Sequence, residues 1–149
     1  MKIYSENKKA YFNYDILEKF EAGIVLLGHE VKSIKTGRIN LAGSYVVLMK
    51  NEPYLINANI SPYQPKNTSP DYKPDRPRKL LLNKSEIKYL IGKEREKRLT
   101  LIPLKVYTNK GKIKIEFGIG KGRKKTDKRE LIRKRETDRD IKRELKIRG

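Results

Sequence analysis

The sequence predicts a mainly β fold, an OB-like closed or partly closed barrel with two or three small helices and a basic C-terminal tail. Three observations predict it. Short runs of strand-forming residues alternate with turn residues, Lys112–Ile119 has a clear period of two, and the composition becomes strongly basic after residue 120. Closing the sheet removes the edges that a small β domain must otherwise protect. We expect one body, residues 1–120, and a tail, residues 121–149.

The first half of the chain is expected to contain strands separated by short breaks. The runs rich in strand-forming residues are Ala22–Leu27, Ser44–Met49 and Tyr54–Ile60. The last two are joined across Lys50–Pro53, a length typical of a hairpin. The segment His29–Gly37 is instead expected to be a short helix, because Val31 and Ile34 are three residues apart and Gly37 can end it.

A proline-rich segment follows, from residue 61 to residue 77. It holds five prolines, each of which lacks the backbone N–H needed in a central strand. Long segments of this kind are usually functional or disordered. We therefore expect residues 61–77 to form a surface loop.

The second half is expected to contain a helix between strands. Arg78–Leu82 leads into Asn83 and Glu86, which have the spacing of a capping box. A helix with one apolar side should begin there. Leu99–Tyr107 is the next expected strand, and a turn at 109–111 leads to Lys112–Ile119, whose apolar residues all fall on one face.

The charge of the chain indicates a polyanionic partner. Its formal net charge is +19, and residues 121–149 contribute 14 − 6 = +8 of it. Nucleic acid is favoured over an anionic membrane or an acidic protein, since no apolar run approaches the roughly 20 residues needed to span a bilayer. Charged residues interrupt the N-terminus where a signal peptide would need an apolar core, so a cytoplasmic location is expected.

The tail combines helix-forming residues with very few apolar ones. Pairs such as Glu130–Lys134 and Asp138–Lys142 favour a helix, but only five large aliphatic side chains lie in residues 121–149. An isolated helix of this length is marginal in water. We expect the tail to be disordered when free and helical when bound to RNA, which would supply the missing counter-charge.

The residue patterns do not predict an enzyme, a metal site or a cofactor. The segment Gly118–Gly122 lacks the spacing of a phosphate-binding loop and is expected to be a flexible exit from the last strand. His29 is the only histidine and is expected at a surface or interface. Tyr11 and Tyr14 are the aromatic residues best placed for exposure and for stacking on bases.

Several stretches resemble one family when they are taken together. These are Tyr14–Ile34, Asn40–Leu41 with Ser44–Tyr45, Arg78–Asn83 (RKLLLN), and Gly120–Lys125 with Asp127–Arg129. In this order they are similar to the SsrA-binding protein (small protein B, SmpB) family. The resemblance implies a non-enzymatic, monomeric partner of transfer-messenger RNA in trans-translation. It would bind the tRNA-like domain, while its tail occupies the empty mRNA path and decoding region of a stalled 70S ribosome, including 16S rRNA. The nascent peptide is then tagged for degradation and the ribosome is released.

The resemblance also implies the functional residues. Those expected to bind the tRNA-like domain are Glu30, Lys32, Lys35, Leu81, Asn83, Lys121, Arg123, Lys124 and Lys125. Those expected in the ribosome-bound tail are Asp127, Lys128, Arg129, Arg133, Lys134 and Arg135. Two alternatives stay open from the residues alone: Glu30 can serve as a structural helix-start carboxylate, and Leu81 can belong to the core. Thr126 stands where the family commonly has Tyr or His, so a stacking contact there is in doubt.

Two other functions fit a small, basic, tailed protein. A structural ribosomal protein would remain on ribosomes washed at high salt. An RNA-modifying or RNA-cleaving enzyme would turn over RNA in the presence of Mg²⁺.

Overall fold

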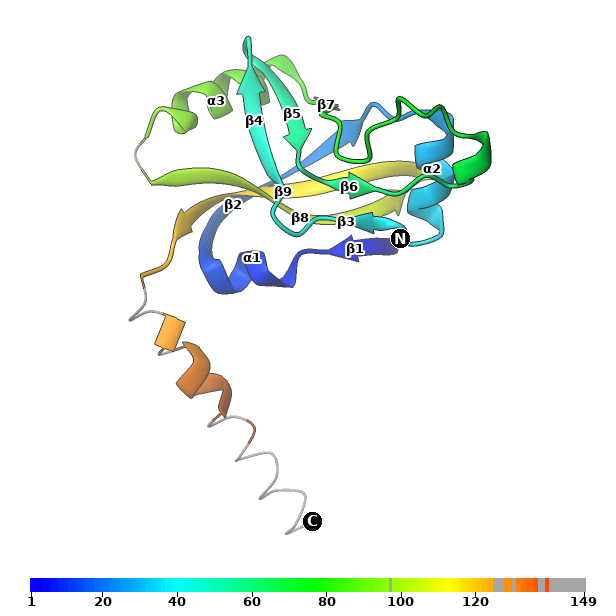
Figure 1. The fold of residues 1–149 in the computed structure, drawn as a ribbon. Helices are drawn as coiled ribbons and strands as arrows, with labels where there is room; N and C mark the ends of the chain where they lie inside the picture. Colours follow the sequence, from blue (N-terminus) through cyan, green and yellow to red (C-terminus); the bar gives the residue numbers. More distant parts are fainter. Residues whose placement is uncertain (97, 125–127, 130, 137–138, 140–149) are drawn as a thin grey trace.

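The computed structural model describes residues 1–96, 98–124, 128–129, 131–136 and 139. In these ranges the protein is mainly β, with three short α-helices on the body and a helical piece in the tail (Figure 1). The strands are paired antiparallel. No helix among the described residues is long and apolar enough to cross a lipid bilayer.

The main sheet closes into a ring. Its strands are β2 (Tyr14–Ile24), β4 (Tyr45–Met49), β5 (Glu52–Ile56), β7 (Arg78–Leu81), β8 (Leu99–Asn109) and β9 (Lys112–Gly122). The sheet order runs from β8 through β4, β5, β7 and β2 to β9, and β9 pairs with β8 again. β1 (Lys2–Glu6) adds to β8, and β3 (Ile39–Asn40) pairs with β6 (Asn59–Ile60) in a small second sheet. The prediction of a mainly β fold with a closed or partly closed barrel is therefore confirmed.

Helices occupy the connections. α1 (Lys8–Asn13) precedes β2, α2 (Gly28–Lys35) follows it, and α3 (Lys84–Glu94) joins β7 to β8. The predicted capping box of α3 is present, because the Asn83 side chain accepts the Glu86 N–H at 2.8 Å. α1 was not predicted, since it is short and has little apolar periodicity.

The core lies inside the ring. β9 supplies Ile115, Phe117 and Ile119, which are buried as the alternation predicted. Ile34 of α2 and Leu90 of α3 are fully buried against the same cluster. A smaller cluster of Ala10, Ile102 and Leu104 holds α1 on β8.

Two strand predictions were wrong in their extent. The strand expected at Ala22–Leu27 is β2, which begins at Tyr14 and ends at Ile24, because pairing with β9 supports the polar residues before Ala22. Tyr14 is accordingly half-buried in a strand. The run Tyr54–Ile60 is broken, since Asn57 has a φ of +62° and separates β5 from β6.

The glycine-rich segment after Phe117 is strand and not a flexible exit. β9 continues to Gly122 and pairs with both β2 and β8 there. A Cβ at Gly118 would lie 2.8 Å from Cγ2 of Ile16 and 3.0 Å from the Glu18 carbonyl oxygen. These glycines let the neighbouring strands approach β9 closely. The cluster of glycines in this part of the sequence therefore indicates close packing of strands and not a flexible segment.

The proline-rich segment, all of which the structure describes, holds one 3-10 turn, η1 (Pro65–Asn67), and no strand. The tail residues 128–129, 131–136 and 139 are helical. Because β9 ends at Gly122, the body extends two residues past the predicted boundary at 120. Disorder of the free tail stays a prediction.

Candidate nucleic-acid interface

The predicted functional residues of α2 lie on two different faces of the helix, one buried and one exposed. Glu30, Ser33 and Ile34 are buried, whereas Lys32 and Lys35 are exposed. This division follows from the helical period, because positions three and four apart share one side. The two lysines thus lie within one turn of each other on the solvent side of the body.

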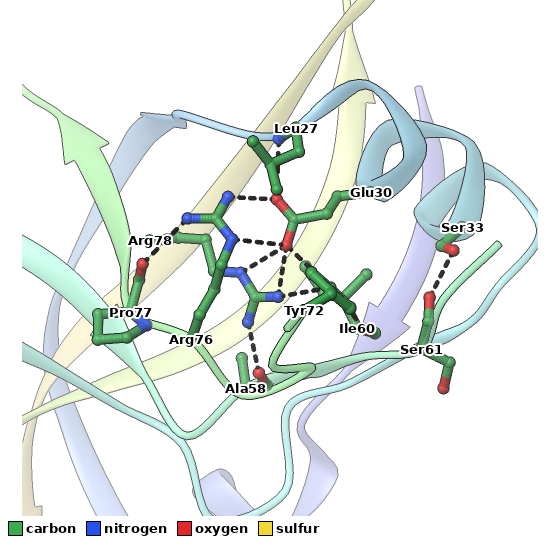
Figure 2. A network of polar contacts seen from close by, with 10 residues as sticks. All are labelled: Leu27, Glu30, Ser33, Ala58, Ile60, Ser61, Tyr72, Arg76, Pro77 and Arg78. Atoms are coloured by element: carbon green, nitrogen blue, oxygen red, sulfur yellow. Dashed lines mark hydrogen bonds and ion pairs between the residues drawn. The ribbon is translucent and has the colours of Figure 1, made fainter. Parts of the chain in front are cut away.

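Glu30 lies at the centre of a buried ionic network (Figure 2). Arg78 donates from Nη2 at 2.5 Å and from Nε at 3.0 Å to Oε2 of Glu30. Arg76 donates to both carboxylate oxygens, with Nε at 3.1 Å from Oε2. The backbone N–H of Leu27 donates to Oε1 at 2.8 Å, and this contact caps the start of α2.

The same network fixes the proline-rich segment. The Tyr72 hydroxyl lies 3.0 Å from Oε2 of Glu30 and 2.8 Å from the Ile60 carbonyl oxygen, and it accepts from Arg78 at 3.0 Å. Arg78 also donates to the Ala58 carbonyl at 2.8 Å. The side chains of Glu30 and Arg78 are both 0% exposed. The network therefore joins α2, β7 and the segment between them.

This geometry matches the structural alternative for Glu30. Its carboxylate oxygens accept hydrogen bonds from groups of its own chain, and it lies below the surface. A direct contact of Glu30 with RNA stays an untested prediction. Tyr72, Arg76 and Arg78 were not predicted as partners of Glu30, because they lie more than 40 residues further along the chain.

Stability should depend on pH through Glu30. Burial opposes ionisation of this carboxyl group, but hydrogen bonds from Arg76, the Leu27 N–H and Arg78 outweigh it and lower its pKa from 4.5 to about 2. The ionised group therefore stabilises the fold above about pH 4.5. This contribution, about 3 kcal/mol, should be lost progressively as the pH falls from 4.5 towards 2. Urea unfolding followed by circular dichroism should show the loss.

Glu30→Gln is the control for this pH dependence. The variant should be less stable at pH 6 and should show a flatter stability curve between pH 4.5 and pH 2.5. Equal slopes for the two proteins would contradict the role given to Glu30.

Leu81 and Asn83 lie at the end of β7 and just after it. Leu81 is 55% exposed, so the structure does not support the core-packing alternative. It pairs with Gly23 of β2, where a Cβ would lie 3.3 Å from that of Leu81. Asn83 is exposed, but its Oδ1 already accepts from the Glu86 N–H and the Ser85 hydroxyl, both at 2.8 Å. Its amide nitrogen is the part best placed to bind a ligand.

The root of the tail borders an open, cationic groove of about 980 Å³. Its lining includes Arg98, Lys121, Arg123, Lys124 and Lys134. The Arg123 N–H donates to the Asn13 carbonyl at 2.9 Å, which holds the end of β9 beside α1. The groove gathers three of the predicted RNA-binding cations at one place.

The described part of the tail lies against α1. Lys128 Nζ and Arg135 Cζ are each 5.8 Å from the centre of the Phe12 ring. Arg129, Arg133 and Lys134 are exposed. Lys125, Thr126 and Asp127 lie outside the described residues.

The acidic side chains and the single histidine are the groups of this chain from which a metal site could be built. Within the described ranges, no group of three or more His, Cys, Asp or Glu side chains lies close enough to hold a metal ion. His29 is half-buried, and its ring meets the edge of Tyr72 with centroids 4.6 Å apart. His29 therefore packs against Tyr72, whose hydroxyl group is bonded to Glu30.

Comparisons with known proteins agree with this architecture. The model of the family described as SmpB protein matches residues 4–147. The chain is 52% identical to the SsrA-binding protein of Carboxydothermus hydrogenoformans, with 99% of this chain and 98% of that protein covered. It is 51% identical to the SsrA-binding protein of Syntrophobacter fumaroxidans, with coverage of 94% and 86%. A chain of a solved structure described as "tmRNA-SmpB: a journey to the center of the bacterial ribosome" is 42% identical, with a TM-score of 0.67 over 87% of this chain and 94% of that one.

Proposed function

Since the chain belongs to the SmpB family, we propose that it binds SsrA, the transfer-messenger RNA, and acts with the ribosome in trans-translation. The observation that carries this proposal is the match of the family model to nearly the whole chain, body and tail together. The role is one of binding and positioning, without a catalysed reaction. A cytoplasmic location and a monomeric state accompany this proposal.

The charge distribution supports RNA as the partner. A net charge of +19 attracts polyanions, and the exposed Lys32 and Lys35 of α2 lie on a rigid, hydrogen-bonded support. Because the backbone that carries these lysines is already ordered, RNA binding need only order their side chains.

The body is proposed to bind the tRNA-like domain. Lys32, Lys35, Lys121, Arg123 and Lys124 supply phosphate contacts, with Lys125 beside them in the sequence. Leu81 and Asn83 offer an apolar surface and an amide donor at the end of β7. Glu30 acts through the loop and helix that it holds together.

The tail is proposed to enter the empty mRNA path and the decoding region of a stalled ribosome. Helical residues 131–136 carry Arg133, Lys134 and Arg135, all exposed to solvent. Lys128 and Arg129 precede them, as does Asp127, which is outside the described residues. Ribosomal RNA would supply the counter-charge that a tail so poor in apolar groups lacks. The nascent peptide is then tagged for degradation and the ribosome is released.

RNA recovered with the protein tests the proposed function. The tagged full-length protein, captured from a cell extract and washed in moderate salt, should retain transfer-messenger RNA as the most enriched RNA by sequencing. The structural ribosomal alternative predicts stoichiometric 16S or 23S rRNA that survives a high-salt wash. Recovery of that pattern, without enrichment of transfer-messenger RNA, would overturn the proposal.

A further inference from the structure

The start of the proline-rich segment is fastened to α2 and to the turn after it. The buried Ser33 hydroxyl donates to the Ser61 carbonyl at 2.6 Å, and the Ser61 N–H donates to the Arg38 carbonyl at 3.2 Å. Arg38 Nη1 in turn donates to the Tyr63 carbonyl at 3.0 Å. The other end of the segment is held by Glu30 through Tyr72 and Arg76. The segment is thus attached to α2 at both ends, which fixes the backbone that carries Tyr63.

Tyr63 brings an aromatic ring next to two cations. Lys32 Nζ lies 5.9 Å from the ring centre and Arg38 Cζ lies 6.0 Å from it. Both distances are at the outer limit of a cation–π contact, about 6 Å, so the ring holds the two side chains only weakly. Arg38 also donates to the Tyr63 carbonyl, but this bond uses only one of the N–H donors of its guanidinium group. Within the described part of the chain, neither cation has a carboxylate oxygen within 4.0 Å.

A ring with two cations and no neighbouring acid has the chemistry of a stacking site in single-stranded RNA. Every base offers a flat face to such a ring, and the phosphates on either side need positive charge. A ring that served only to anchor the loop would not need Lys32 beside it, because hydrogen bonds from Ser33, Ser61 and Arg38 already fasten this part of the chain.

We propose that Tyr63 stacks on an unpaired base of the bound RNA while Lys32 and Arg38 contact the flanking phosphates. This inference rests on the proposed function, because it names a contact within that RNA complex. It extends the interface from α2 onto the proline-rich segment and adds two residues, Tyr63 and Arg38, to those expected from the sequence.

The absence of tryptophan from the chain permits a direct test. Tyr63→Trp introduces the only tryptophan, at the proposed stacking position. Titration with an in vitro transcript of the tRNA-like domain of transfer-messenger RNA should quench its fluorescence by at least half. Tyr54→Trp is the matched control, because Tyr54 is also half-buried but lies on β5. Its fluorescence should change little at the same RNA concentrations.

The salt dependence of RNA affinity distinguishes a stacking contact from a phosphate contact. Tyr63→Leu should weaken binding about 10-fold in fluorescence anisotropy without changing the slope of log Kd against log salt. Tyr63→Phe, which keeps the ring, should bind within about twofold of the wild type. Arg38→Gln should reduce the slope by about 0.7 to 1, as expected for one lost phosphate contact. Thermal melting of each variant checks that the fold is intact.

The outcomes distinguish this inference from the function on which it rests. If the wild type does not bind the transcript, both the proposed function and this inference are wrong. If the wild type binds, while Tyr63→Leu binds equally well and Tyr63→Trp is not quenched, only the inference is overturned. The ring would then serve to hold the loop.

Discussion

Glu30→Ala is expected to lower the free energy of unfolding by about 3 to 5 kcal/mol, the range measured when one partner of a buried ion pair is removed. The reason is Arg78, whose side chain is 0% exposed and would remain charged without its carboxylate. Arg78 would keep the hydrogen bond from Nη1 to the Ala58 carbonyl, but its Nε would lose the carboxylate that accepts its hydrogen bond. Urea unfolding at pH 7, followed by circular dichroism, measures the effect.

Glu52→Ala provides the matched control. Glu52 also pairs with a cation, Lys79, at 3.4 Å, but both side chains are about half exposed. Exposed pairs of this kind contribute roughly 0 to 1 kcal/mol, so the control should barely change stability. Similar losses for the two variants would contradict a central role of the buried network.

This expectation changes how RNA binding by Glu30 variants is interpreted. Loss of affinity in Glu30→Ala does not by itself indicate a contact with RNA, because the change also releases Tyr72 and Arg76 from α2. Binding measured well below the melting temperature, together with Tyr72→Phe, which keeps the ring and removes only the hydroxyl, separates the two effects.

Removing residues 125–149 is expected to abolish tagging on stalled ribosomes while affinity for the tRNA-like domain falls by no more than a few-fold. The deletion begins after Lys124 because β9 extends to Gly122 and the Arg123 N–H bonds to Asn13. It removes 11 − 6 = +5 of the net charge, so some general loss of affinity is expected. Filter binding and a reconstituted translation assay on a message without a stop codon measure the two activities.

A scrambled tail tests whether charge alone is sufficient. The same residues in another order keep the length and charge but alter the positions of Lys128, Arg133 and Arg135. We expect this variant to bind the tRNA-like domain as the wild type does and to remain inactive in tagging. Full tagging activity of the scrambled protein, or equal loss of RNA binding and tagging in the truncated one, would argue against separate roles for body and tail.

The local features of the fold could be predicted from the sequence. The alternation of Lys112–Ile119 and the capping box at Asn83 each depend on neighbouring residues, and both are present. Features set by distant residues could not be predicted in this way. β2 begins at Tyr14 because β9 pairs with it, and Gly118 is required because Ile16 and Glu18 approach it.

The candidate site follows the same division. The exposure of Lys32 and Lys35 follows from the helical period, and a role for Glu30 at the start of α2 was among the alternatives. Its partners Tyr72, Arg76 and Arg78 come from a segment with little periodicity. These residues come close to Glu30 only in the folded chain. Tyr63 and Arg38 are likewise distant in the sequence and are brought together by the fold.

β9 also determines where the tail starts from. Lys121 pairs with Asp15 on one side and with Leu99 on the other, and the bond from Arg123 to Asn13 continues this attachment by one more residue. The direction in which the chain leaves the barrel is therefore set by the pairing of β9 with β2 and β8. If the body binds a folded RNA as proposed, the point where the tail begins, at Gly122 and Arg123, is fixed relative to that RNA.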